Sequence, residues 1–284
     1  MKQLAPDGPP IDAANSIPSA GLGPIAEPIV KFVKTVATVV ELEVRKLRHD
    51  STDLLTRAIQ PFLWLVVFGQ VFTRVRGIPT GHLRYIDFMA PGVLAQSVLF
   101  VAIFYGISTI QERDQGIIVK FLVSPVPRTA IVLGKALSAG VRGLSQCTII
   151  YLLSIVRRIH LSLNPWHILA VVATVILSAS LFSTFSLVIA CLVKTQQRLM
   201  GIGQIITMPL FFASNAIYPI SIMPHWLQIV SRINPLTYEV DALRSMMLRD
   251  LSSHYGIGTD LGILFAVAGV LVVIAGKLYP KIVN

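Results

Sequence analysis

The chain has 284 residues, of which 54% are hydrophobic and 13% are charged, whereas soluble domains carry roughly 25% charged residues. This balance excludes an ordinary water-soluble domain and predicts an integral membrane protein, because each spanning helix needs about 20 mostly apolar residues. The formal net charge of +10 indicates membrane topology rather than nucleic-acid binding, since no basic patch with base-reading side chains accompanies it.

The N-terminal part of the chain contains two segments of different composition. Residues 1–28 are rich in Pro, Gly, Ala and Ser, which predicts a disordered cytoplasmic tail. In residues 29–49, valines recur at helical spacing between lysines and arginines, which predicts an amphipathic helix lying in the cytoplasmic membrane interface. A soluble helix packed on a partner is the alternative for this segment.

Residues 50–284 are predicted to form an all-α transmembrane domain with six spanning helices. The six apolar segments cover residues 58–73, 88–110, 130–156, 167–193, 199–213 and 259–277. With both termini in the cytoplasm, 15 of the 24 Lys and Arg lie on the inner side, 8 lie on the outer side and Arg142 lies within a span. Because Lys and Arg favour the cytoplasmic side, this distribution predicts cytoplasmic termini.

The segment Gln111–Lys135, between the second and third spans, is charged and interrupted by prolines. Glu112 and Arg113 end the second span, residues 116–123 predict a short amphipathic helix, and Pro125 ends that helix. A short helix clamped between two spans would act as a rigid lever and as a docking surface for a partner. A simple connecting loop is the alternative.

The region Ser214–Asp250 is too polar to span a membrane and too apolar for a free loop. It predicts two short helices, near Pro224–Arg232 and Pro235–Leu248, that re-enter the outer leaflet and start at their prolines. Asn234 is expected to cap the second helix. Backbone at that depth must face protein or water, so the region predicts an outer gate, with an external cap as the alternative. The expected gate residues are Tyr218, Pro219, Pro224, Trp226, Asn234, Pro235, Tyr238 and Arg244.

Arg142 lies near the middle of the third span, where a charge is costly and normally faces a cavity or a partner. Glu239 or Asp241 of the re-entrant helices are its candidate partners, and a shifted span that places Arg142 nearer the surface is the alternative. In the sixth span, Gly258 and Gly262 begin a small-residue face that predicts close helix contact, within the subunit rather than between subunits.

Sequence signatures of an enzyme are missing from the chain. A phosphate-binding loop requires G-x-x-x-x-G-K-[ST], but Thr129 stands where the first glycine should be, and Ala136 follows Lys135. The six histidines are dispersed without neighbouring ligand types. The chain is therefore expected to have no catalytic residues, no metal site and no cofactor of its own.

Two motifs carry a family resemblance. The pattern E-R-x-x-G-T…L-L-x-x-P-x-x-R…G-K is matched at Glu112, Arg113, Gly116, Leu122, Pro125, Arg128, Gly134 and Lys135, and the chain departs from it at Ile117, which replaces the usual Thr. The pattern Y/F-P-x-x-x-M-P-x-W-L…N-P-L-T-Y…A-L-R is followed from Tyr218 to Arg244. Through these motifs, from about residue 30 to the C-terminus, the chain resembles membrane subunits of type-2 ATP-binding-cassette exporters, which include daunorubicin-resistance permeases and nodulation-factor exporters.

The resemblance implies the permease subunit of an exporter in the inner membrane of a prokaryote, surrounded by membrane lipids. Two copies of a cytoplasmic ATPase, which bind ATP and Mg, would dock on the segment between the second and third spans. A second permease copy or a sister permease would complete the pathway. The implied coupling residues are Glu112, Arg113, Gly116, Leu122, Pro125 and Arg128, of which the first two would pair with charges on the ATPase.

The expected substrate is amphiphilic: a drug, a lipid or a glycoconjugate. Soft and aromatic side chains suit such a pathway, although ordinary helix packing explains them equally well. The candidate pathway residues are Phe100, Phe104, Met208, Phe211, Phe212, Ser214 and Asn215. A membrane scaffold or assembly factor, and an ATP-independent carrier, are the alternative functions. The carrier is less favoured, because the first five spans show no acid and the chain shows no repeat.

Overall fold

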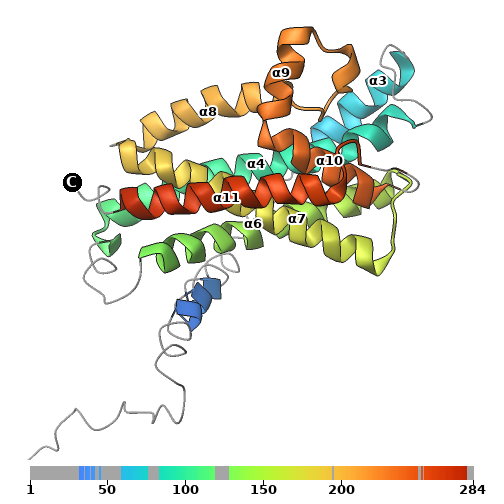
Figure 1. The fold of residues 1–284 in the computed structure, drawn as a ribbon. Helices are drawn as coiled ribbons and strands as arrows, with labels where there is room; N and C mark the ends of the chain where they lie inside the picture. Colours follow the sequence, from blue (N-terminus) through green and yellow to red (C-terminus); the bar gives the residue numbers. More distant parts are fainter. Residues whose placement is uncertain are drawn as a thin grey trace, which may run out of the picture.

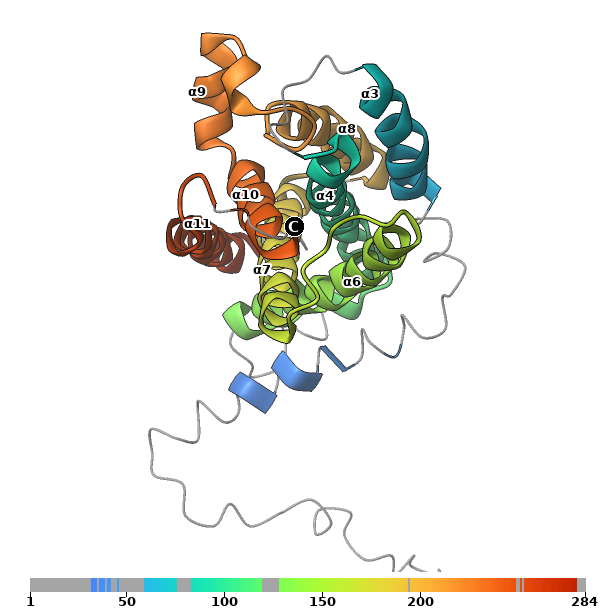
Figure 2. The ribbon, with the colours of Figure 1, turned by 90° about the vertical axis from the view of Figure 1, so that its right-hand side faces the viewer.

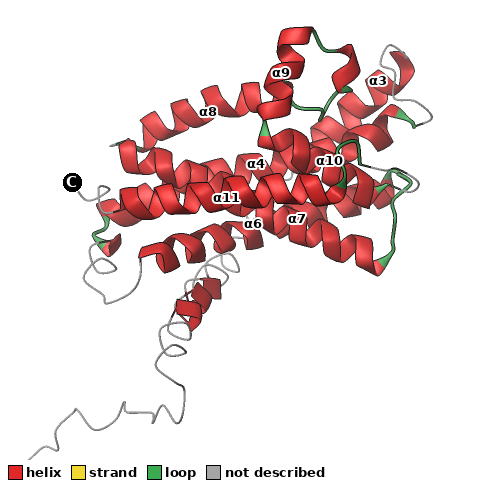
Figure 3. Ribbon diagram, viewed as in Figure 1, coloured by secondary structure: helices red, strands yellow, loops and turns green. Residues whose placement is uncertain are grey.

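The computed structural model describes residues 59–75, 83–118, 128–193, 195–248, 251 and 253–279, together with part of 32–45 (Figure 1). Within these residues the regular structure is helical, and the one strand-like feature is an isolated bridge between Leu161 and Leu248 (Figure 3). The all-α prediction is therefore confirmed for the described part of the chain. The predicted tail 1–28 lies outside it.

The helices follow one another in a simple order. They are η2 (Trp64–Phe68), α3 (Gly69–Val75), α4 (Tyr85–Asp114), α6 (Arg128–Val156), α7 (Pro165–Leu192), α8 (Gln196–Phe212), η3 (Ile220–Ile222), α9 (His225–Ile233), α10 (Pro235–Met247) and α11 (Ile257–Leu278). The long helices run lengthwise side by side in Figure 1 and are seen end-on in Figure 2. Near the N-terminus, residues 32–34, 36–38, 40–41 and 45 are helical, within the predicted 29–49 helix.

Four helical segments are long and apolar enough to cross a membrane, namely Tyr85–Asp114, Thr129–Val156, Pro165–Leu192 and Ile257–Leu278. The helix Ile59–Phe72 is apolar but shorter, and α8 has 17 residues. Two of the six expected spans therefore stay predictions. The observed α4 extends beyond the predicted 88–110 at both ends, which brings the buried acids Asp87 and Glu112 into this helix. The expectation of acid-free early spans is thus wrong, and ion pairs explain why the helix tolerates these acids.

Local capping explains where several helices begin. The Asn234 side chain accepts a hydrogen bond from the backbone N–H of Leu236 at 3.0 Å, and Pro235 occupies the first turn of α10, which confirms the predicted cap. Asn164 caps α7 in the same way, with the N–H of Trp166 at 3.1 Å. Pro224 instead occupies the N-cap of α9, one position earlier than predicted.

Helices α4 and α7 form the centre of the bundle. Within the most apolar stretch of each span, 78% of residues are buried in α4 and 72% in α7, against 39% in α6 and 11% in α11. The backbone of α4 approaches its neighbours closely at Gly92, where a Cβ atom would lie 2.3 Å from the carbonyl oxygen of Ala216. The missing side chain of Gly92 thus admits the backbone of the turn that follows α8.

The two short outer helices occupy different environments. Every α10 residue after Pro235 is buried, and this helix packs against α4, α7 and α11. In α9 only Ser231 is buried, Trp226 is 66% exposed, and the helix projects from the bundle (Figure 1). The sequence predicted two equivalent re-entrant helices, but only α10 is inserted among the long helices.

The small-residue face of α11 does not contact the rest of the subunit. Among the described residues, no atom lies within 4 Å of a Cβ built on Gly258 or Gly262. The predicted close contact within the subunit is therefore wrong for these two glycines. The reason is geometric, because α11 lies at the edge of the bundle (Figure 2) and both glycines are exposed.

Candidate functional site

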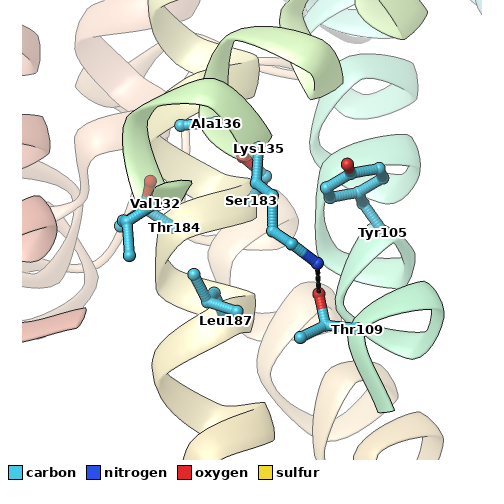
Figure 4. Close-up of a pocket in the computed structure, with 8 residues that line it drawn as sticks. All are labelled: Tyr105, Thr109, Val132, Lys135, Ala136, Ser183, Thr184 and Leu187. Atoms are coloured by element: carbon cyan, nitrogen blue, oxygen red, sulfur yellow. Dashed lines mark hydrogen bonds between the residues drawn. The ribbon is translucent and has the colours of Figure 1, made fainter. Parts of the chain in front are cut away.

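A buried ion pair joins the end of α4 to the start of α6. The ammonium group of Lys135 contacts the carboxylate of Glu112. It also donates a hydrogen bond to Thr109 Oγ1 at 3.3 Å (Figure 4). The two charged side chains are only 5% and 10% exposed. Glu112 and Lys135 stand near the two ends of the segment Gln111–Lys135, between the second and third spans. The ion pair therefore holds the two ends of this segment together.

This geometry changes the interpretation of Glu112. The resemblance implied that its carboxylate pairs with an ATPase, but the carboxylate lies inside the chain, against Lys135. Arg113 instead pairs with Asp114 at 2.9 Å, and the Asp114 side chain is 53% exposed at the end of α4. Gly116 follows with φ +70°, a left-handed conformation that commonly ends helices at glycine.

The remaining expected coupling residues are only partly described. Leu122 and Pro125 lie outside the described residues. Arg128 forms the first residue of α6, and its side chain is not described. The coupling role of the six residues therefore stays a prediction.

Polar side chains continue along the α4–α6 interface from the ion pair. On α4, Tyr105, Thr109 and Glu112 recur at helical spacing and share one face. On α6, Arg142 places its guanidinium 5.1 Å from the centroid of the Tyr105 ring, within the range of a cation–π interaction. Arg142 therefore faces α4, as expected for a charge that faces a partner within the bundle.

A small enclosed space accompanies this polar interface. It lies between α4, α6 and α7 (Figure 4). Its walls are Tyr105, Thr109, Val132, Lys135, Ala136, Ser183, Thr184 and Leu187. The space is too small to admit a water molecule, and the Lys135 and Glu112 side chains are themselves only 5% and 10% exposed. Charges interact more strongly in such surroundings than in water.

A hydrophobic cluster covers the same end of the bundle. It contains Ile118, Ile131, Val132, Leu187, Cys191, Ala275 and Tyr279. Burial raises the pKa of Tyr279, and the nearby charge of Glu112 raises it further. The last described residue of the chain thus packs close to the ion pair that closes the coupling segment.

Two of the predicted gate residues, Arg244 and Asn234, tie α10 to its neighbours at the opposite end of the bundle. Arg244 donates a hydrogen bond to the carbonyl oxygen of Asn215 at 2.7 Å, and its guanidinium stacks 3.9 Å from the centroid of the Phe88 ring. The Asn234 amide donates to the carbonyl oxygen of Leu210 at 2.6 Å. These contacts fasten α10 to α4 and to the end of α8. Burial lowers the pKa of Arg244.

The other gate residues make local contacts. Tyr218 donates to the carbonyl oxygen of Phe212, and Tyr238 donates to that of Arg232, each at 2.6 Å. Both hydroxyl groups thus reinforce turns that connect helices. Trp226 is exposed on α9. A gating movement of this region stays a prediction.

The expected pathway residues fall into two groups. Met208 and Phe212 are 39% and 45% exposed on one face of α8, and the rings of Phe100 and Phe104 stack at 6.1 Å on α4. Phe211, Ser214 and Asn215 are buried. Met208 and Phe212 are therefore available to a ligand or a second subunit. Phe100 and Phe104 are half-buried, and the buried residues serve packing and hydrogen bonding.

A carboxylate cluster that the sequence did not predict as a site connects α10 to α11. The hydroxyl group of Ser253 lies 2.9 Å from Asp241 Oδ2 and 2.7 Å from Asp260 Oδ2. Asp241 Oδ2 also accepts hydrogen bonds from the backbone N–H groups of His254 and Tyr255. Asp241, one suggested partner of Arg142, is thus engaged in holding this turn.

The second suggested partner, Glu239, is fully buried on α10 beside Ser178 of α7. Burial raises the pKa of Glu239 well above its ordinary value, which favours the neutral acid. The available sequence signal for this site was a pair of acids, Glu239 and Asp241, in a short helix that the sequence placed in the outer leaflet.

The bundle and its outer surface define the class of protein. Four apolar spans surround buried ionic and polar contacts, while large apolar side chains are exposed on α8 and α11. Exposing so many apolar side chains to water is energetically unfavourable, whereas a lipid bilayer solvates them. These features define an integral membrane protein.

The chain belongs to the ABC-2 type transporter family, whose model matches residues 35–248. It is 28% identical over 215 residues to a protein of Cyanophora paradoxa named as a transport permease, ycf38, covering 75% of this chain and 74% of that protein. It is 23% identical over 244 residues to the daunorubicin resistance ABC transporter permease protein DrrB1 of Streptomyces coeruleorubidus, covering 83% and 81%. It is 31% identical over 179 residues to YbhR of Escherichia coli K12, named as a multidrug ABC transporter permease, covering 63% and 48%.

Proposed function

We propose that this chain is the membrane-spanning subunit of an ATP-driven exporter and that a separate cytoplasmic ATPase supplies the energy. The observation that carries the proposal is the buried pair between Glu112 and Lys135, which stands at the two ends of the expected docking segment. A displacement of that segment would move α4 and α6 together, because the pair joins the end of one helix to the start of the other. Membership of the ABC-2 type transporter family supports the same role.

The exposed end of α4 is the part of the described structure best suited to receive the ATPase. Arg113 and Asp114 lie one and two residues beyond the buried Glu112, and the Asp114 side chain is 53% exposed. Charged pairs across an interface fix register and exclude wrong partners. Docking at this position would press directly on the helix whose last turn is held by Lys135.

The complete exporter would contain two ATPase copies and two permeases, with the termini of this chain in the cytoplasm of the inner membrane. Helices α8 and α3 lie away from α11 (Figure 2). Large apolar side chains are exposed on α8 and within residues 59–71. Met208 and Phe212 belong to this surface, where a second permease copy or a sister permease would enclose the pathway. The relatives named for multidrug and daunorubicin resistance support an amphiphilic drug as substrate. A lipid or a glycoconjugate would share that chemistry.

Purification of the tagged chain from native membranes tests this proposal. We expect a stoichiometric soluble protein with a phosphate-binding loop to accompany the chain, and ATP-dependent drug accumulation in inside-out vesicles to require both. Arg113→Glu should abolish the association, while Arg232→Glu, on the exposed opposite end of the bundle, should leave it intact. Transport without ATP, or purification without an ATPase under conditions that preserve other membrane complexes, would indicate a carrier or a scaffold instead.

A further inference from the structure

A lateral groove lies between α6, α7 and α11. Helix α11 lies at the edge of the bundle (Figure 2). Its volume is about 490 Å³. At one end, α6 and α11 touch, since a Cβ atom on Gly276 would lie 3.1 Å from Thr129. Beyond this contact the two helices enclose the groove, and α7 contributes its third wall.

The walls of the groove offer apolar contacts only. Leu133, Leu177, Phe265 and Val272 are among the side chains that line it. Ser180 is the one hydrogen-bonding side chain among the described residues that line the groove, and its hydroxyl group lies 2.7 Å from the carbonyl oxygen of Ile176 and 3.0 Å from that of Ala136. A polar ligand would therefore find no partner in the groove.

The apolar surface continues from the groove towards the end of the bundle that carries α9 and α10. On α7, Leu169 and Trp166 precede the lining residue Ala173 by four and seven residues, which places them on the same helical face. They are 59% and 76% exposed. Tryptophan is enriched where a membrane helix meets the lipid headgroups. This face thus leads from a membrane interface into the groove.

The surroundings determine what fills this groove. Its three helices are all candidate spans, so it opens towards lipid hydrocarbon. Apolar cavities are not filled by water, and a cavity of about 150 Å³ binds benzene. At the same density, about 490 Å³ holds roughly 20 carbon atoms, which is the size of one acyl chain.

We propose that the groove binds one acyl chain of a resident membrane phospholipid, whose glycerol and headgroup lie at the level of Trp166. The bound chain would fill the wedge between α6 and α11. This proposal depends on the membrane location of the protein and not on its coupling to an ATPase. It can therefore fail while the exporter proposal stands, and the reverse also holds.

Photo-crosslinking tests the proposal with the full chain in vesicles of phosphatidylcholine that carry a diazirine near the end of one acyl chain. We expect crosslinks concentrated in 133–137, 173–180 and 265–272. Gly269→Leu fills the groove without a clash, because no described atom lies within 4 Å of its Cβ position, and should reduce these crosslinks at least five-fold. Ala266→Leu is the matched control, because Ala266 is exposed on the same helix but does not line the groove.

A second variant, on another helix, keeps the test valid if Gly269→Leu fails to fold. Ala173→Leu fills the groove from the α7 wall and should give the same loss. Native mass spectrometry of the purified protein should retain one phospholipid per chain in the parent and in Ala266→Leu, but not in the two filled variants. Crosslinks spread evenly over the exposed apolar helices, or unchanged by both filling variants, would overturn the proposal. Crosslinking of a second protein chain into the groove, in place of lipid, would do the same.

Discussion

Reversing one charge of the buried pair should destabilise the protein, and reversing both should restore it. Glu112→Lys places two ammonium groups together where the native side chains are only 5% and 10% exposed. Removing one partner of a buried pair costs about 3–5 kcal/mol, because the other charge is left uncompensated. Since folded domains are stable by only about 5–15 kcal/mol, the single variant should lose much of its folded population.

The double variant Glu112→Lys/Lys135→Glu re-forms the pair with opposite polarity, and the Thr109 hydroxyl group, which accepts from Lys135 in the parent, can donate to the new carboxylate. The four proteins form a double-mutant cycle, measured as thermal denaturation midpoints in detergent and as abundance in the membrane. We expect both singles to fall well below the parent and the double variant to recover most of the loss.

The same cycle separates an internal role of Glu112 from a role in docking. If Glu112→Lys denatures at the parental temperature but releases the ATPase, the carboxylate contacts the partner and the argument from burial is refuted. A double variant no more stable than the singles would also refute it. Asp114→Lys is the control for the denaturation temperature only, because Asp114 belongs to the proposed docking position. The Asp114 side chain is 53% exposed, and such surface pairs contribute about 0–1 kcal/mol.

Two further pairs of substitutions test the packing and the outer turn. Gly92→Ala should reduce the free energy of unfolding by about 1–3 kcal/mol and so lower the denaturation temperature. The reason is that the new Cβ at position 92 would lie 2.3 Å from the carbonyl oxygen of Ala216. Gly201→Ala, on α8 with no described atom within 4 Å, should instead stabilise the helix by up to about 1 kcal/mol. At the outer turn, Asp260 and Asp241 both lie within hydrogen-bond distance of the Ser253 hydroxyl group, and Asp241 also accepts from the backbone N–H groups of His254 and Tyr255. Asp260→Asn should therefore cost little, whereas Asp241→Asn weakens an acceptor of two backbone N–H groups and should lower the denaturation temperature more; equal losses in both variants would contradict this assignment.

The sequence predicted the features that depend on local chemistry. The lengths of the apolar segments indicated where the long helices lie. The short polar side chain of Asn234 and the proline that follows it indicated the start of α10. The outer helices show the limit of this reasoning. Both carry apolar residues, yet α10 is buried and Trp226 of α9 is 66% exposed, because the neighbours that cover α10 come from distant parts of the chain.

The buried ion pair was beyond prediction for a related reason. Glu112 and Lys135 are 23 residues apart, and the sequence shows two charges without showing that they meet. The family resemblance directed attention to an external partner for Glu112. Gly92 illustrates the same limit, because Pro91-Gly92 inside a helix suggests a weak point, whereas the missing side chain admits the backbone at Ala216.

The unequal burial of the spans has a consequence for how their sequences can diverge. In α4, where 78% of the most apolar stretch is buried, each side chain is constrained by the shape of particular neighbours. In α11, where the corresponding share is 11%, most side chains face a fluid that selects for apolar character but not for shape. Among homologous permeases, the last helix should therefore drift freely among Leu, Ile, Val and Phe, while α4 should change only through paired substitutions.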